Sequence, residues 1–340
     1  MSRIAIDAMG GDRGPREVVL GVVQAHERWP EIDLTLVGRS EEIEPVLKEL
    51  GSKAEGIKVF HASEVVTMDD SPAEAVRSKR DSSINRCAGL VAKGLADAIV
   101  SPGNTGAVVA SATLQWRLLG PIKRPGIAVS IPTSRGVTMV VDVGANIYPK
   151  PLHLCQYAAM ASVYSTLIWH VEKPRIGLLN IGSENAKGTG LVREAHDQLT
   201  RSKLNFVGNL EGYDLWDGAY DVVVCEGFVG NVLLKVSEGL WPELLRQVSV
   251  EMAKQMGDGS ESWMKAITKL ILRYDYAEYG GAPLLGTNGI CIICHGSSNA
   301  KAFMNATRLA NECVAMGLNK HMLEAVEAAG FDQGVEGSPA

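Results

Sequence analysis

The chain has 340 residues, of which 46% are hydrophobic and 21% are charged, a balance typical of globular proteins with a sizeable core. Its formal net charge of −6 gives no reason to expect binding to nucleic acid. No apolar run approaches the length of a membrane-spanning helix, and charged residues interrupt the N-terminus where a signal peptide would be apolar. We therefore expect a soluble, cytoplasmic protein made of two domains or of one large α/β unit.

The six cysteines are dispersed along the chain, and most of them lie in apolar stretches. This usage is typical of buried, reduced thiols in a cytosolic protein. Cys291 and Cys294 have the spacing of a redox or zinc pair, but they fall within a strand-like run and no second pair accompanies them. We expect no metal site and no cofactor.

The N-terminal segment is predicted to alternate strand and helix, over residues 3–7, 16–28, 34–38 and 41–50. Asp7 and Asp12 flank the pair Gly10-Gly11 at the carboxyl end of the first strand. In open α/β sheets ligands bind at that edge, so these residues are candidates for binding.

A capping box, Ser71-Pro-Ala-Glu74, predicts a further helix with proline at its first position. It leads into a basic cluster formed by Arg77, Lys79, Arg80 and Arg86. Solvated charges at a helix end are the ordinary explanation for such a cluster. A docking surface for an acidic partner is the alternative.

Residues 175–190, RIGLLNIGSENAKGTG, combine a short apolar run, a glycine-rich loop and the start of a helix. Backbone N–H groups at the positive end of a helix dipole suit a phosphate, and Lys187 adds a full positive charge. The spacing matches neither a P-loop nor a GxGxxG fingerprint, so ATP and NAD are not indicated. An ordinary strand-to-helix turn with a solvated lysine remains the alternative.

The order of strand, small polar loop and helix recurs along the chain, with loops at Asp7, Ser101, Asp142, Gly182, Glu226 and His295. The further predicted elements cover residues 98–100, 107–118, 137–143, 157–169, 221–225, 232–240, 290–294 and 300–316. Because parallel strands place their carboxyl ends at one edge of a sheet, we expect all six loops to converge on one crevice. Glycine lets backbone approach a ligand there, and Asn, Ser and Thr offer neutral hydrogen bonds.

The loops contain the segments IAIDAMGGDRGP, SPGNTGA, VVDVGAN, NIGSENAKGTG, CEGFVGN and YGGAPLLGTNG, the last followed by HGSS. With these segments in this order from Ile4 to Ser298, the chain resembles the bacterial acyl-ACP:phosphate acyltransferases, the PlsX family of phospholipid synthesis. It departs from the family at Pro102, where alanine is common, and at Asn85-Arg86-Cys87, which replaces a more apolar stretch.

The resemblance implies a three-layer α/β/α fold with a mostly parallel sheet, similar to phosphotransacetylase and to isocitrate and isopropylmalate dehydrogenases, and a homodimer. It implies an acyltransferase that converts long-chain acyl-[acyl carrier protein] and inorganic phosphate to acyl phosphate and free carrier. The product would supply a membrane glycerol-3-phosphate acyltransferase. We expect residues 1–331 to form one catalytic unit with a helical hairpin around 241–275, followed by a disordered tail over 332–340.

Lys187 and Asn231 match the family's catalytic lysine and asparagine. We expect Lys187 to hold the phosphate or the oxyanion, Asn231 to position the reactants, and phosphate to attack the thioester directly. Without the resemblance, Asn231 reads as an N-cap before a helix from Val232. The other candidate substrate- or phosphate-binding residues are Asp7, Gly10, Gly11, Gly103, Asn104, Thr105, Asn146, Gly182, Ser183, Glu184, Asn185, Glu226, Gly227, His295 and Ser297.

Three neighbouring groups have a second interpretation. Glu226 is a candidate for orienting Lys187 by charge pairing. His295 is a candidate acid for the leaving thiol, although such a histidine is more often hydrogen-bonded structure. Cys225 is the candidate nucleophile of a rival covalent mechanism, but no cation lies near it in the sequence.

Because both the chain and acyl carrier proteins are acidic, docking needs a local basic patch. The candidates are the basic cluster named above or the set Arg117, Lys123 and Arg124. Residues 263–274 predict an amphipathic helix with a basic face and an apolar face that contains Trp263, Ile267, Leu270 and Ile271. This pattern is typical of helices at an anionic membrane surface, and we expect reversible membrane association. Packing on the core or on a dimer partner is the alternative.

Other functions remain open at this point. One is a short-chain phosphotransacetylase or a sugar-acid dehydrogenase with the same fold. Another is a non-catalytic, membrane-associated scaffold for lipid synthesis, which would be indifferent to replacement of Lys187.

Overall fold

The computed structural model describes residues 1–256, 265, 268, 270 and 276–332. The first elements in chain order are β1 (Arg3–Asp7), α1 (Pro15–Arg28), β2 (Asp33–Gly38), α2 (Ser40–Leu50), η1 (Gly51–Ala54), β3 (Lys58–His61), α3 (Pro72–Ser78), α4 (Ser83–Ala92), β4 (Ala98–Ser101) and α5 (Thr105–Trp116). The middle of the chain forms β5 (Gly126–Thr133), β6 (Gly136–Val141), α6 (Pro151–Ile168), β7 (Ile176–Leu179), α7 (Gly190–Arg201), β8 (Phe206–Leu210), η2 (Gly212–Asp217), β9 (Val222–Val224) and α8 (Gly227–Met256). The last elements are η4 (Tyr276–Glu278), β10 (Ala282–Leu285), β11 (Ile290–Ile293), α10 (Ala300–Ala315) and α11 (Leu318–Ala328).

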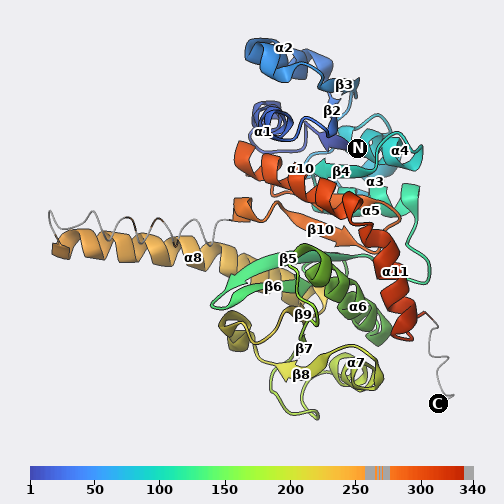
Figure 1. The fold of residues 1–340 in the computed structure, drawn as a ribbon, viewed down its shortest axis with the longest axis vertical. Coiled ribbons are helices and arrows are strands. Elements are labelled where there is room, and N and C mark those ends of the chain that lie inside the picture. The colour runs from blue at the N-terminus through green and yellow to red at the C-terminus, as the bar shows by residue number, and fades with distance from the viewer. Residues whose placement is uncertain (257–264, 266–267, 269, 271–275, 333–340) are drawn as a thin grey trace.

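The strands form one 11-stranded sheet in the order β3-β2-β1-β4-β11-β10-β5-β6-β9-β7-β8. Figure 1 shows them stacked from β3 at the top to β8 at the bottom. The strands β3, β2, β1, β4 and β11 are parallel to one another, and so are β6, β9, β7 and β8. The sheet is therefore mostly parallel, as predicted.

The two parallel halves of this sheet run in opposite directions. The pairs β11–β10, β10–β5 and β5–β6 are all antiparallel, so the direction reverses three times between β11 and β6. The carboxyl ends of β1, β4 and β11 consequently lie at one edge of the sheet, and those of β6, β9 and β7 lie at the other. The prediction that all six loops share one edge is wrong.

The sheet is covered by helices on both faces, which gives the three-layer α/β/α arrangement that the resemblance implied. One apolar core packs residues of α1, α2, α6, α7, α10 and α11 on one face. A second core packs residues of α3, α4, α5, α8 and η2 on the opposite face. All six cysteines are buried and free, as expected from the composition.

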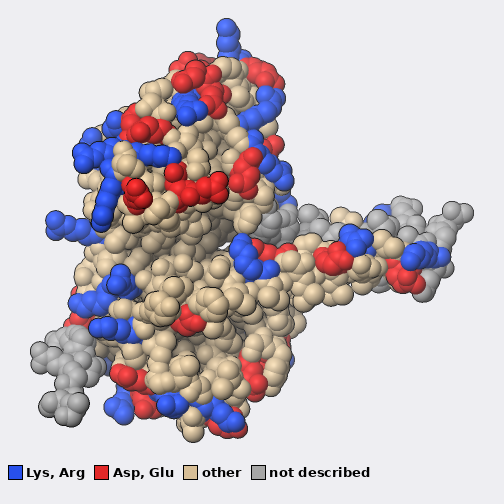
Figure 2. All heavy atoms as spheres, turned by 180° about the vertical axis from the view of Figure 1, so that it is seen from behind, with Lys and Arg blue, Asp and Glu red and all other residues tan. Residues whose placement is uncertain are grey.

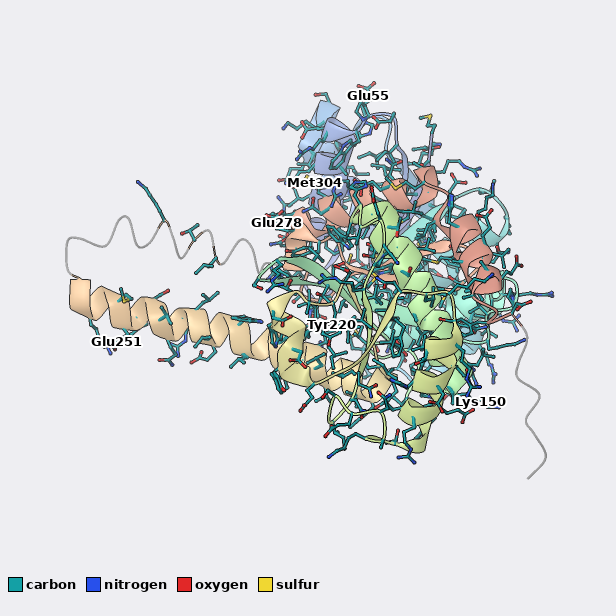
Figure 3. The ribbon with its side chains drawn as sticks, turned by 60° about the horizontal axis from the view of Figure 1, so that its bottom comes forward. Glu55, Lys150, Tyr220, Glu251, Glu278 and Met304 are labelled. Atoms are coloured by element: carbon teal, nitrogen blue, oxygen red, sulfur yellow. The ribbon has the colours of Figure 1, made fainter. Side chains whose placement is uncertain are left out.

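The helix α8 differs most from its prediction. It begins at Gly227, five residues before the predicted start, and it runs through Pro242 to Met256 as one helix rather than two. Its far part projects from the body (Figure 1), and Figure 3 places Glu251 on that projecting part. Among the helices in the described part of the chain, none is long and apolar enough to cross a membrane.

The predicted membrane-contacting face falls mainly outside the described residues. Trp263, Ile267 and Ile271 are among the residues that the structure leaves out, and Leu270 is described as 44% exposed. The helix predicted after Ser71 is present as α3 and begins at Pro72, but the capping box is not seen, because the Ser71 side chain forms no capping hydrogen bond.

Candidate active site

The loop after β7 presents Lys187, and amide side chains hold the path of its backbone. The Asn180 amide donates to the Lys187 carbonyl (3.2 Å), and its oxygen accepts from the Ile181 N–H (2.9 Å). The Asn209 amide, in β8, donates to the Glu184 carbonyl (3.3 Å), which also accepts from the Lys187 N–H (3.1 Å). The loop is thus tied to two neighbouring strands.

The Lys187 side chain is exposed, and its stem lies over Gly182. A Cβ at Gly182 would lie 3.1 Å from Lys187 Cγ and 2.7 Å from a Glu184 carboxylate oxygen, so glycine lets both side chains pass close to the loop backbone. Two residues on, Thr189 caps α7 by accepting from the Val192 N–H (3.3 Å). The loop therefore places a lysine next to the positive end of a helix, an arrangement that suits an anion.

The loop after β6 lies beside this region, because β6 and β7 both flank β9. The buried Asp142 carboxylate accepts from the N–H groups of Ile127 (3.0 Å), Gly144 (3.1 Å), Ala145 (2.9 Å) and Asn146 (2.7 Å). Burial raises the pKa of Asp142, and these hydrogen bonds oppose the shift. Asp142 therefore organises the loop rather than facing a ligand.

Asn146 contributes to the same framework with its side-chain amide and with its backbone carbonyl. Its amide donates to the Pro125 carbonyl (2.6 Å) and to the Tyr157 hydroxyl (2.8 Å), and its carbonyl accepts from the Gly227 N–H (2.8 Å). Gly227 must be glycine, since a Cβ there would lie 2.5 Å from the Asn146 carbonyl oxygen. These two predicted phosphate-binding residues connect the β6 loop to the start of α8.

Glu226 caps α8 with both carboxylate oxygens. One accepts from the Phe228 N–H (2.7 Å) and the other from the Val229 N–H (2.9 Å). Within the described residues, Glu226 forms no ion pair with Lys187, so the expected charge pairing is not seen. The capping role that the sequence suggested for Asn231 thus belongs to Glu226.

Asn231 lies in the second turn of α8 and is exposed. Its side chain faces the β6 loop, because a Cβ at Gly144 would lie 3.7 Å from Asn231 Oδ1. The helix can approach that loop closely because Gly230, next to Asn231, carries no side chain: a Cβ there would overlap the Asp142 carbonyl. The Asn231 amide therefore lies at the same sheet edge as Lys187.

The Lys187 loop and the start of α8 together border one cleft of about 400 Å³. Its lining residues are Leu154, Leu178, Leu179, Asn180, Ile181, Gly188, Thr189, Leu191, Val192, Cys225, Glu226 and Val229. The Lys187 and Asn231 side chains are not among them, but both residues belong to the segments that form the walls. The exposed Ser183 and Asn185 stand on the same loop.

The remaining predicted binding residues gather at the opposite sheet edge: Asp7, Gly10, Gly11, Gly103, Asn104, Thr105, His295 and Ser297. Asp7 is fully buried and accepts from Ser101 Oγ (2.7 Å) and the Met9 N–H (3.0 Å), and burial raises its pKa. Gly10 and Gly103 approach so closely that a Cβ at Gly10 would overlap Gly103. Asp7, Gly10 and Gly103 therefore form a tightly packed loop junction.

Two polar members of this second group are engaged within the chain. Asn104 caps α5 by accepting from the Ala107 N–H (3.1 Å), and its amide donates to the Thr67 carbonyl (3.2 Å). His295 is exposed, and its Nδ1 lies 2.8 Å from Ser297 Oγ. The predicted role of Asn104 in binding phosphate is therefore not supported, because its side chain is buried and its polar atoms are used.

Cys225 is buried at the end of β9, and its Sγ donates to the Asp142 carbonyl (3.4 Å). Burial raises the pKa of the thiol, with the Asp142 and Glu226 charges adding to the shift. A thiol held in its neutral form is a poor nucleophile, which opposes the covalent mechanism. In the described part of the chain, no three His, Cys, Asp or Glu side chains are grouped so that they could hold a metal ion.

Comparison with known proteins gives a consistent result. Residues 2–321 match the family described as "Fatty acid synthesis protein". The chain is 44% identical to the phosphate acyltransferase of Desulforamulus reducens over 99% of this chain and 100% of that protein. It is 47% identical to the phosphate acyltransferase of Desulfitobacterium hafniense over 93% of this chain and 95% of that protein. The chain belongs to the phosphate acyltransferase family.

Solved structures agree with this assignment at the level of fold. The chain superposes on a phosphotransacetylase from Streptococcus pyogenes with a TM-score of 0.60 at 17% identity, covering 96% of this chain and 94% of that one. For a branched-chain phosphotransacylase from Enterococcus faecalis the TM-score is 0.55 at 14% identity, with 92% and 99% covered. The fold predicted from the resemblance is confirmed.

The sequence interpretation missed the residues that hold the loops of the candidate site in place. Asn180 could have been found, because an asparagine at a strand end that opens a glycine-rich loop is a common loop-ordering residue. Asn209 carries no local signal, because its partner Glu184 is 25 residues away. Asp142 was recognised only as the start of a small polar loop after a strand, although its hydrogen bonds organise the whole β6 loop.

Proposed function

We propose that the chain transfers a long-chain acyl group from an acyl carrier protein to inorganic phosphate, forming acyl phosphate and free carrier. Relatives at 44% and 47% identity, both named phosphate acyltransferase, support the reaction class. The observation that supports this site is the exposed Lys187 in the loop before α7, a loop that borders one cleft together with the start of α8. The short-chain phosphotransacetylase remains the second candidate because its fold is shared.

The proposed chemistry is direct displacement. A phosphate oxygen attacks the thioester carbonyl carbon, a C–O bond forms, and the C–S bond breaks as the carrier's thiolate leaves. Lys187 holds the phosphate or the developing oxyanion through its positive charge, and the Asn231 amide positions the reacting groups. Because phosphate is already anionic at neutral pH, positioning and fixed charge supply most of the rate without a strong base.

For carrier docking we propose the groove between α3, α4 and α5, which has a volume of about 370 Å³. Arg77, Arg80, Arg86 and Lys93 line it together with the exposed apolar residues Phe60, Leu95 and Leu114. Figure 2 shows Lys and Arg side chains on the upper half of the molecule, interspersed with Asp and Glu side chains. Such a groove matches an acidic surface that also offers apolar side chains.

The predicted docking set changes in one residue. Lys79 forms an ion pair with Asp70 (2.6 Å) and donates to the Val65 carbonyl (3.0 Å), so it supports the fold and does not line the groove. Lys93, which the sequence interpretation left out, takes its place. The second set, Arg117, Lys123 and Arg124, lies between α5 and β5.

We extend the proposal to the surroundings of the reaction. The protein would act as a homodimer. Because an acyl phosphate is amphipathic, its release at a membrane suits an enzyme that associates reversibly with that membrane and supplies a membrane glycerol-3-phosphate acyltransferase. The proposed membrane contact is the 263–274 segment, most of which lies outside the described residues.

The test is to incubate the protein with phosphate and palmitoyl-carrier and to measure acyl phosphate and free carrier thiol. The proposal expects both products in equal amounts and no reaction without phosphate. Activity on acetyl-CoA but not on the palmitoyl-carrier would favour the phosphotransacetylase. The double variant Arg80→Glu/Lys93→Glu should raise the KM for the carrier and leave the KM for phosphate unchanged, whereas Arg117→Glu/Lys123→Glu should change neither.

A further inference from the structure

The cleft beside the Lys187 loop has an apolar interior. Leu154 of α6 and Leu178 of β7 form its buried base, being 1% and 0% exposed. Leu191 and Val192, in the first turn of α7, and Val229 of α8 form its sides. Four different elements therefore contribute hydrophobic surface to one concave site.

The polar groups of the cleft are already engaged with backbone. Thr189 Oγ accepts from the Val192 N–H, and the Glu226 carboxylate accepts from two N–H groups at the start of α8. The Asn180 side chain bonds both to the Lys187 carbonyl and to the Ile181 N–H. A polar ligand would therefore gain few hydrogen bonds inside the cleft, whereas a hydrocarbon chain would gain from burial of apolar surface.

Apolar surface continues from the cleft into solvent. Ile181, in the glycine-rich loop, is 79% exposed, and Val229 is 42% exposed. Exposed aliphatic side chains that adjoin an apolar cleft extend its apolar surface, and contiguous apolar surface of this kind is typical of a binding site. Ile181 belongs to the Lys187 loop, and Gly188 and Thr189 of the same loop also line the cleft.

We infer that this cleft binds the acyl chain of the substrate, with the reacting carbonyl at the Lys187 loop and the hydrocarbon tail running toward Leu154 and Leu178. Leu191 and Val192 then restrict the length of chain that fits. The inference rests on the proposed function, since it assigns the substrate's hydrocarbon part to a place within the same site.

The experiment narrows the cleft with Val192→Phe and, separately, with Leu191→Phe, two half-buried positions where a larger side chain can be accommodated. Val207→Phe, on the exposed face of β8 and outside the cleft, is the matched control. For each protein, kcat/KM is measured with butyryl-, octanoyl-, dodecanoyl- and palmitoyl-carrier. Thermal melts confirm that each variant is folded.

Both cleft variants should lose activity on the palmitoyl-carrier about ten-fold or more relative to the butyryl-carrier, because methylene groups lose their apolar contacts. Val207→Phe should keep the wild-type ratio. An equal loss at all chain lengths in both cleft variants would overturn the inference. If the wild type formed no acyl phosphate from any carrier, the proposed function would fail instead. Titration with dodecanoate would then test the cleft by itself. The inference expects the wild type to bind dodecanoate and Val192→Phe to bind it at least ten-fold more weakly.

Discussion

Glu226 offers a prediction whose size follows from the structure. Its two oxygens accept from the Phe228 N–H (2.7 Å) and the Val229 N–H (2.9 Å) at the start of α8. Glu226→Ala removes this cap, which costs about 1 kcal/mol of unfolding free energy, and removes a favourable charge at the positive helix end, which costs about 0.5 kcal/mol more. With an unfolding entropy of about 2 cal/mol/K per residue, the sum lowers the Tm by about 2 °C for a chain of this length.

The assay pairs calorimetry with turnover, and Glu226→Asn is the control. Asparagine keeps a capping oxygen and loses the charge, so its Tm should stay within about 1 °C of wild type. Because Asn231 lies in the second turn of α8, fraying in Glu226→Ala should also lower kcat, whereas Glu226→Asn should largely retain it. A wild-type Tm for Glu226→Ala would refute the capping role. A stable Glu226→Asn that has lost its activity would restore the charge-pairing role toward Lys187.

Three further outcomes follow from the packing, from the thiols and from the surface charges. Gly230→Ala should destabilise the fold by about 1–3 kcal/mol, because a Cβ there would overlap the Asp142 carbonyl. Gly239→Ala has nothing within 4 Å of its Cβ and should stabilise α8 by about 0.5–1 kcal/mol. Urea titrations measure both free energies of unfolding, and equal effects would contradict the close approach of Gly230 to Asp142. Iodoacetamide at mildly alkaline pH should leave the activity unchanged while the protein is folded, because all six thiols are buried, and rapid loss with one thiol modified would speak for a nucleophilic cysteine. Hydrogen bonds from the Ser63 side chain and backbone, followed by one from Arg86, lower the pKa of Asp81 from 3.8 to about 2. The stability that Asp81 contributes is therefore present above pH 3.8 and is lost as the pH falls toward 2. Asp81→Asn should flatten the curve of unfolding free energy against pH between these values, and an unchanged curve would contradict the assigned contacts.

Local elements could be predicted well because they depend on local pattern. The apolar run before Gly182 and the periodic residues after Gly190 lie close to the observed β7 and α7. Most predicted strands and helices differ from the structure by a few residues at their ends. For the helices, capping interactions decide at which residue the element begins and ends. For α8 that interaction is the Glu226 cap, which starts the helix five residues before the predicted position.

The direction of the strands could not be derived from the strand-loop-helix pattern alone. That pattern suggested a uniform parallel sheet, and it missed the hairpins β5–β6 and β10–β11, which together with the β10–β5 pairing reverse the chain direction. A signal was present, because Thr133-Ser-Arg-Gly136 is a short turn between two apolar runs. As a result the candidate site was predicted as one constellation, whereas Lys187 and Asn231 share an edge that Asp7 and His295 do not.

The central claim is that the reaction takes place at the edge formed by β6, β9 and β7 and depends on the charge of Lys187. The direct measurement is kcat for acyl phosphate formation by Lys187→Ala at saturating phosphate. Lys173→Ala, an exposed lysine at the opposite end of β7, serves as the matched control. The account predicts a loss of about 10²–10³ in kcat for Lys187→Ala with an unchanged Tm, and wild-type kcat for Lys173→Ala. A wild-type kcat for Lys187→Ala would contradict it.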